Sequence, residues 1–317
     1  MITDINDRIS RLDWHREPYG LYEPIAYTLD TGGKRLRPQL LLLANQLFGG
    51  DAEKALPAAL AIEIFHNFTL LHDDVMDRAD TRRGRPTVHV RWNDNTAILS
   101  GDQMLIEAYK QLSQLPDAKQ PTVFRLFSQM ATGICEGQQY DMEFEQRSDV
   151  SIDEYMRMIR LKTSVLLAYA LQIGAYIAGA DERQQQALYD YGINLGLAFQ
   201  IQDDLLDVYG NPATFGKAIG GDILCGKKTF MLLTALSQAD TETRKRLLQL
   251  LQDHTLSPDK KIAAVTHIYD TLNVRQEAEQ TIQHLTEQAL HHLTDLPDNE
   301  VKNALIGLAK ALTKRNT

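Results

Sequence analysis

The sequence predicts an all-α protein that forms a single domain over residues 1–317. Apolar residues recur at helical spacing through long stretches, as at Leu56, Leu60 and Ile64, and paired glycines or prolines interrupt them. The one candidate strand, Thr87–Trp92, is too short and isolated to found a sheet. We therefore expect a protein built almost wholly from helices.

The composition is that of a globular protein, and it disfavours some classes of binding partner. Of the 317 residues, 44% are hydrophobic and 24% are charged, and the formal net charge of -9 disfavours nucleic acid as a partner. The amino terminus lacks the apolar run of a signal peptide, and no apolar patch is long enough for a bilayer. We expect a cytoplasmic protein without stable membrane insertion. Cys135 and Cys225 stand in no metal-binding pattern, which predicts reduced thiols without a catalytic role.

Two helices are predicted near the amino terminus. The first covers Tyr22–Leu29 and ends at a pair of glycines, whose backbone tolerates the positive φ angles of a helix stop. The second covers Leu40–Phe48 and follows Pro38, which suits the first turn of a helix. Between them, GGKRLRP is predicted to be a loop, in which Lys34 and Arg37 flank flexible backbone and can grip an anion.

The long helix that follows carries the first acidic cluster. Asp51 can cap this helix at its start, and the helix leads to Asp73, Asp74 and Asp77. Because Asp73 and Asp77 are four residues apart, a helix places both carboxylates on one face. Carboxylates of this kind bind Mg2+ and leave coordination positions for water and phosphate oxygens.

Basic and polar side chains flank this cluster. Arg82, Arg83 and Arg85 follow it within ten residues, so acid precedes base, which suggests metal on one side of a diphosphate and guanidinium groups on the other. His66 lies two helical turns before the cluster, and Thr69 lies between them on the same face. A solvated, charged helix end and a buried, hydrogen-bonded histidine are the ordinary alternatives.

Three helices are predicted in the middle of the chain. The first follows an Asn95 cap, the second covers about 121–145, and the third follows a Ser151 cap and covers about 152–180. Lys162 interrupts the apolar face of the third helix. Such a lysine either reaches the surface or pairs with an anion in a polar cavity.

A second acidic cluster ends the helix that begins at Asp181. Its members, Asp203, Asp204 and Asp207, repeat the spacing of the first, so the two clusters can bracket a diphosphate with several Mg2+ ions. The loop behind it is rich in glycine and lysine, and contains Gly216, Lys217, Gly220, Gly221, Asp222, Gly226, Lys227 and Lys228. The remainder of the chain is predicted to be helical, with proline breaks.

The ordered set of motifs resembles the trans-isoprenyl diphosphate synthases, also called polyprenyl synthetases, over nearly the whole chain. GGKRLRP, DDVMD with TRRGRP, the Lys162–Thr163 pair, QDDLLD led by Gln200, and the Gly216–Lys217 loop occur in the family's order and approximate spacing. The short-chain geranylgeranyl and farnesyl diphosphate synthases are the most similar members. The resemblance implies a bundle of antiparallel helices around a central cavity, usually as a homodimer.

The activity that the resemblance implies is head-to-tail condensation of isopentenyl diphosphate with an allylic diphosphate, such as dimethylallyl, geranyl or farnesyl diphosphate. No protein nucleophile is needed. Metal and guanidinium charge stabilises the departing diphosphate, the alkene of isopentenyl diphosphate attacks the allylic cation, and the released diphosphate accepts the proton. Apolar helix faces exclude water that would quench the cation.

The resemblance also implies a role for each polar residue. About three Mg2+ ions on the allylic diphosphate would be held by the aspartates of both clusters, Asp73, Asp74, Asp77, Asp203, Asp204 and Asp207. The same diphosphate would contact Arg82, Lys162 and Lys217, which with Asp73 and Asp203 form the implied catalytic set. Isopentenyl diphosphate would bind without metal to Lys34, Arg37, His66 and Arg83. Supporting substrate-binding residues would be Gln138, Asp141, Thr163, Gln200 and Lys227.

Phe68 is the residue that the resemblance places at the floor of the product cavity. It lies five residues before the first aspartate, and Thr69 follows it without a second aromatic ring. This pattern resembles enzymes that make twenty-carbon geranylgeranyl diphosphate, with fifteen-carbon farnesyl diphosphate as the alternative. Phe65, one turn earlier, can narrow the cavity or belong to the core.

Other classes of protein fit the motifs less well. A class I terpene cyclase usually has a second metal motif of mixed side chains and needs no site for isopentenyl diphosphate. A head-to-head synthase lacks that site too. A non-catalytic regulatory subunit would be expected to lack one acidic cluster or its basic partners. A phosphohydrolase built on a His-Asp pair would leave the second DDxxD unexplained.

Overall fold

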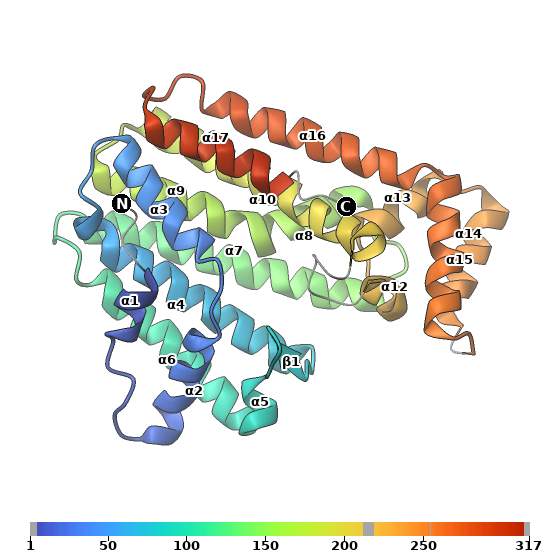
Figure 1. Ribbon diagram of the computed structural model, residues 1–317, viewed down its shortest axis with the longest axis horizontal. Helices are drawn as coiled ribbons and strands as arrows, with labels where there is room; N and C mark the ends of the chain where they lie inside the picture. Colours follow the sequence, from blue (N-terminus) through green and yellow to red (C-terminus); the bar gives the residue numbers. More distant parts are fainter. Residues whose placement is uncertain (1–4, 212–218, 254, 314–317) are drawn as a thin grey trace. The chain divides into compact units, whose positions relative to one another are not determined.

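The computed structural model describes residues 5–211, 219–253 and 255–313, and this part of the chain is almost entirely helical (Figure 1). The all-α prediction is confirmed. Contacts between Cα atoms divide the chain into two compact units. The first comprises Met1–Gln129 with Tyr169–Gln186, and the second comprises Met130–Ala168 with Ala187–Thr317.

The first unit is built around one long helix. This helix, α4 (Ala52–Met76), packs against α3 (Leu36–Leu47) and α6 (Asp94–Leu112). Its side chains Ile62, Ile64 and Phe65 are almost completely buried. The smaller elements of this unit are α1 (Ile5–Ser10), α2 (Tyr19–Asp30), β1 (Thr81–Arg82), β2 (Arg85–Pro86) and α5 (Val88–Arg91). The core of this unit therefore fixes the helix that carries the first acidic cluster.

The second unit contains the second acidic cluster and the carboxyl-terminal helices. The described helices that lie entirely within this unit are α8 (Ile152–Ile159), the π-helix η1 (Arg160–Ser164), α12 (Gly221–Cys225), α13 (Phe230–Gln238), α14 (Thr241–Gln252), α15 (Pro258–Thr271), α16 (Val274–His292) and α17 (Glu300–Thr313). Helices α14 and α15 form one adjacent pair, and α16 and α17 form another (Figure 1). The remaining helices, which have residues in both units, are α7 (Gln120–Gln146), α9 (Val165–Ala178) and α10 (Glu182–Tyr209).

Two of the predicted helix starts are confirmed by their hydrogen bonds. The Asp51 side chain accepts a hydrogen bond from the backbone of Glu53 at the start of α4. The Ser151 side chain accepts one from the backbone N–H of Glu154, and the Glu154 carboxylate accepts one from the Ser151 backbone, which completes a capping box. Local sequence was sufficient at both ends because each cap satisfies N–H groups only two or three residues away.

Three local predictions were wrong. The segment GGKRLRP is not wholly a loop, because α3 begins at Leu36 and includes Pro38, whose missing N–H costs nothing in a first turn. Asn93, not Asn95, caps α6, and its side chain accepts a hydrogen bond from the backbone of Thr96.

The third wrong prediction is the strand at Thr87–Trp92, where the structure has the short helix α5. The aromatic and β-branched residues that suggested a strand are used in tertiary packing. Val88 is buried, and the Trp92 ring packs edge-on against Tyr27 with 5.3 Å between centroids. Packing against α2 therefore overrides a weak local preference for strand. The extended residues lie just before this point, in the β1–β2 hairpin.

One helical stretch, 152–178, is long and apolar enough by length and composition to cross a membrane, and 56% of its most apolar window is buried inside the protein. The core helices of globular proteins show the same features.

Candidate active site

The first acidic cluster lies at the carboxyl end of α4, and its three carboxylates have different surroundings. The backbone N–H of Asp77 still donates to the carbonyl of Asp73, so the helical relation of these two residues is kept. Asp77 is exposed and Asp73 is half-buried, whereas Asp74 is buried. The outer pair is therefore more accessible than Asp74, and it keeps the four-residue helical spacing.

Asp74 is bound by Arg82. The Arg82 Nε atom donates to both carboxylate oxygens of Asp74, at 2.8 and 2.9 Å, and Nη2 lies 2.7 Å from Oδ1. Such a two-pronged contact between a guanidinium group and a carboxylate is among the stronger ion pairs. It fixes the β1–β2 hairpin to the end of α4, so Arg82 lies beside the cluster.

The β1–β2 hairpin brings Arg83 to the GGKRLRP segment. Arg83 and Gly84, at the tip, have φ angles of 52° and 74°, as a tight two-residue hairpin requires. The Arg83 guanidinium donates to the carbonyl of Gly32, and Thr31 lies beside it. Gly33 has a φ of 138°, which other residues rarely adopt, and a Cβ atom on it would lie 2.9 Å from Arg83 Nη1. Two motifs far apart in the sequence thus meet in space.

Arg37 and His66 connect the same GGKRLRP segment to α4. Arg37 Nη1 lies 3.0 Å from His66 Nε2. Burial, then the nearby guanidinium groups of Arg37 and Arg83, lower the pKa of His66 well below its usual value. The imidazole is therefore neutral at pH 7, and its Nε2 atom accepts a hydrogen bond from Arg37. Lys34 is exposed nearby in the chain.

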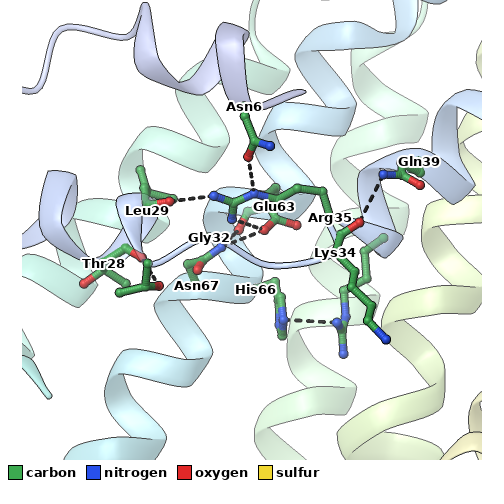
Figure 2. Close-up of polar contacts among 12 residues, drawn as sticks. Asn6, Thr28, Leu29, Gly32, Lys34, Arg35, Gln39, Glu63, His66 and Asn67 are labelled. Atoms are coloured by element: carbon green, nitrogen blue, oxygen red, sulfur yellow. Dashed lines mark hydrogen bonds and ion pairs between the residues drawn. The ribbon is translucent and has the colours of Figure 1, made fainter. Parts of the chain in front are cut away.

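Arg35 is turned away from this group and into the protein. Its guanidinium contacts Glu63 at 2.6 Å, the Leu29 carbonyl at 2.5 Å and Asn6 at 2.9 Å (Figure 2). The side chains of Arg35 and Glu63 are only 4% and 3% exposed. Sequence reasoning missed this pair, because nothing in the run of cations distinguishes the buried arginine from its neighbours.

The predicted floor residue, Phe68, is half-buried on α4. Its ring lies 5.4 Å from the ring of Phe65 and 4.7 Å from that of His72, measured between centroids. Phe65 is 1% exposed and packs on Phe127, so it belongs to the core. The Thr69 hydroxyl donates to the carbonyl of His66 within the same helix.

The second acidic cluster, at the end of α10, contains a carboxylate with several hydrogen bonds. Asp204 accepts from the Tyr155 hydroxyl, from the backbone N–H of Phe230 at 2.9 Å and from Gln200 at 3.3 Å. Burial raises the pKa of Asp204 to about 7. Asp203 is half-buried, and Asp207 accepts a hydrogen bond from the backbone of Asp222 at 3.0 Å. Tyr155 is another residue that sequence reasoning missed.

Lys162 and Thr163 lie on the π-helix η1, which interrupts the predicted long helix. Lys162 Nζ lies 2.6 Å from an Asp141 carboxylate oxygen, and the Thr163 hydroxyl donates to Gln200 at 3.0 Å. The structure thus brings together Lys162 with Asp141 and Thr163 with Gln200. Gln138 precedes Asp141 on α7, and Lys227 is exposed after α12. Lys217 lies outside the described residues.

The donor set of each cluster suits Mg2+. All six side chains offer carboxylate oxygens, the ligands that hard cations prefer. Within residues 5–211, 219–253 and 255–313, no group of three His, Cys, Asp or Glu side chains forms a ready metal centre. Mg2+ in proteins is commonly bound by one or two carboxylates, with water and substrate phosphate completing the octahedron.

The helical architecture and the two aspartate clusters are those of the all-α isoprenoid synthases. The polyprenyl synthetase family model matches residues 18–269. The chain therefore belongs to the polyprenyl synthetase family and is a trans-prenyltransferase.

Similar proteins cover nearly the whole chain. It is 39% identical to a geranylgeranyl pyrophosphate synthase of Geoglobus acetivorans, over 98% of this chain and 96% of that one. It is 36% identical to a geranylfarnesyl diphosphate synthase of Natronomonas pharaonis, over 98% and 95% of the two chains.

Solved structures of two geranylgeranyl pyrophosphate synthases have the same fold as this chain. The geranylgeranyl pyrophosphate synthetase of Pyrococcus horikoshii superposes with a TM-score of 0.93 at 34% identity, covering 98% of this chain and 95% of that one. The geranylgeranyl pyrophosphate synthase of Corynebacterium glutamicum, complexed with isoprenyl diphosphate and magnesium, has a TM-score of 0.86 at 31% identity and covers 99% and 96%.

Proposed function

We propose that this protein condenses isopentenyl diphosphate with allylic diphosphates and releases geranylgeranyl diphosphate as its main product. The observation that carries the proposal is the meeting of GGKRLRP with the β1–β2 hairpin. It gathers Arg37, His66 and Arg83 beside the helix that ends in the first acidic cluster. A terpene cyclase has no need of this second anion site.

In this proposal isopentenyl diphosphate binds to Lys34, Arg37, His66 and Arg83. A neutral imidazole suits this role, because it leaves the guanidinium charge of Arg37 for the anion and orients that side chain through its Nε2 atom. Binding of the diphosphate would replace the contact between Arg83 and the Gly32 carbonyl with a stronger, charge-assisted one.

The allylic diphosphate binds with Mg2+. The aspartates of both clusters would hold about three ions, which would neutralise the leaving group as its bond to carbon ionises. Asp74 and Asp204 are the most enclosed members, so we infer that they support their clusters through Arg82 and Tyr155. Lys162, Arg82 and Lys217 would add positive charge at the same diphosphate.

Membership of the family also supports proposals about the domain organisation, the oligomeric state and the allylic substrates. The matched range, 18–269, extends across the boundaries between the two compact units, which supports one catalytic domain over 1–317. We infer a homodimer in the cytoplasm, with dimethylallyl, geranyl and farnesyl diphosphates as allylic substrates, and Gln138, Asp141, Thr163, Gln200 and Lys227 in supporting contacts.

The activity can be tested directly. Labelled isopentenyl diphosphate is incubated with Mg2+ and each allylic diphosphate in turn, and the products are separated by chain length. Asp73→Ala and Asp203→Ala should each lower turnover by orders of magnitude, because each removes a proposed metal ligand. The exposed Asp298→Ala is the matched control. Near-normal turnover in either cluster variant, with helical circular dichroism intact, would refute the metal assignment.

Product length depends on Phe68 in this proposal. A bulky ring at the cavity floor stops growth, so Phe68→Ala should move the products of the same assay towards longer chains. Thr69→Phe should move them towards farnesyl diphosphate, because a second ring shortens the cavity. An unchanged product profile in Phe68→Ala would remove this residue as the floor, while leaving the condensation activity unaffected.

A further inference from the structure

The ring of His72 joins α4 to α6 immediately before the first acidic cluster. Its Nε2 atom lies 3.1 Å from the carbonyl oxygen of Ile98 and 4.0 Å from a carboxylate oxygen of Asp102. His72 is one helical turn after Phe68, and the two rings meet edge to face at 4.7 Å between centroids. The position of Phe68 is therefore linked to α6 through one side chain.

Gly101 makes this arrangement possible. It is buried on α6, and a Cβ atom built on it would lie 2.5 Å from His72 Cδ2 and closer still to Nε2. Real Cβ atoms essentially never come within 3.0 Å of another heavy atom in this way. Any residue other than glycine at this position would compete with the imidazole for the same space.

Phe68 is held from two sides. On one side it meets Phe65, which is 1% exposed and packs against Phe127, which is 0% exposed, so that wall is part of the close-packed core. On the other side it meets His72, which is 19% exposed at its side chain and rests on the Gly101 gap. The second wall is the one that a single substitution can move.

We propose that Gly101 is a specificity-determining position: it leaves room on α6 for His72, and His72 holds the Phe68 ring that limits product length. His72 is thus a positioning residue for Phe68. The inference rests on the proposed role of Phe68 in setting chain length.

Gly101→Ala should displace the imidazole rather than the helices, because the ring is the movable end of a flexible side chain, whereas α4 and α6 are packed along their length. Displacement removes the hydrogen bond to the Ile98 carbonyl and one wall of the Phe68 ring. The ring can then turn aside, and the product should lengthen by one isoprene unit in part of the population.

The test is the product profile of the full-length enzyme with isopentenyl and allylic diphosphates. We expect Gly101→Ala and His72→Ala to shift the profile to longer chains, each by less than Phe68→Ala. The double variant Gly101→Ala with His72→Ala should match His72→Ala alone, because the added methyl group then has no ring to displace. Gly307→Ala, where nothing lies within 4 Å of the new atom, is the control and should keep the wild-type profile.

The outcomes separate this inference from the proposed function. If Phe68→Ala lengthens the products but Gly101→Ala and His72→Ala lower only the melting temperature or the rate, the inference about Gly101 is wrong. The proposed role of Phe68 in limiting product length is then still supported. If Phe68→Ala leaves the product profile unchanged, both the proposed role of Phe68 and the inference about Gly101 are refuted. Should Gly101→Ala fail to fold, His72→Ala decides the question alone.

Discussion

At the scale of residues, the run Lys34, Arg35 and Arg37 shows how neighbouring cations take different roles. Arg35 has a left-handed backbone with a φ of 45°, which turns its side chain into the protein towards Glu63. Arg37 meets His66, and Lys34 stays exposed. The sequence predicted an anion site here, but it could not separate the buried arginine from the one proposed to bind the anion, because the difference depends on Glu63, 28 residues further along the chain.

Arg35→Ala is predicted to destabilise the protein strongly. Removing one partner of a buried ion pair leaves the other charge without compensation, which costs about 3–5 kcal/mol. Urea unfolding followed by circular dichroism measures this loss. Arg8→Ala, which breaks an exposed pair with Glu53, should cost less than about 1 kcal/mol and serves as the control. Equal stabilities of the two variants would contradict the structural role of Arg35.

At the scale of elements, η1 is a feature that the sequence did not predict. The pattern over 152–180 indicated one helix, whereas five residues, Arg160–Ser164, form a π-helix within it. Two glycines on neighbouring helices leave room for its backbone: a Cβ atom on Gly137 would lie 2.8 Å from Lys162 Cα, and one on Gly196 would lie 2.6 Å from Ser164 Cα. Single-turn π-helices are frequent at functional sites, and this one carries Lys162 and Thr163.

Gly137→Ala should disturb Lys162 specifically. The new methyl group meets backbone on η1, which cannot rotate away, so we expect a loss of about 1–3 kcal/mol from overpacking. The proposed contact of Lys162 with the allylic diphosphate should weaken too, so kcat/KM for that substrate should fall more than kcat/KM for isopentenyl diphosphate.

Gly133→Ala, one turn earlier on α7, is the matched control for that variant. Its Cβ atom would lie 3.6 Å from Leu161 Cδ2, an ordinary contact, and alanine is the better helix former by about 0.5–1 kcal/mol. Unchanged or improved stability is therefore expected, with wild-type kinetics. If the two variants behave alike, the close approach of α7 to η1 has no bearing on Lys162.

At the scale of the whole molecule, the fold class could be predicted because the long helices show a helical periodicity of apolar residues and have recognisable capping residues. The division into two compact units could not, because residues 169–186 group with the first unit by contacts that have no local signature. The hydrogen-bond partners within the acidic clusters could be predicted only in part, for the same reason. Spacing predicted the outer pair Asp73 and Asp77, whereas the partner of Asp204 is Tyr155, 49 residues earlier, and no pattern links the two.

Ligand binding should stabilise the molecule as a whole, and most strongly when metal and diphosphate are present together. A ligand that binds the folded state alone, at about one hundred times its Kd, adds about 2.7 kcal/mol. Inorganic diphosphate with Mg2+ should therefore raise the melting temperature more than diphosphate with excess EDTA, which can occupy only the proposed metal-free site at Arg37, His66 and Arg83, and more than Mg2+ alone. The cooperation arises because Mg2+ retains open positions for phosphate oxygens and the anion alone would meet uncompensated carboxylates. Asp73→Asn and Asp203→Asn should each reduce the shift, whereas Asp298→Asn should keep it. A full shift with diphosphate in EDTA would mean that the basic side chains alone hold the anion, and the two acidic clusters would then need another role.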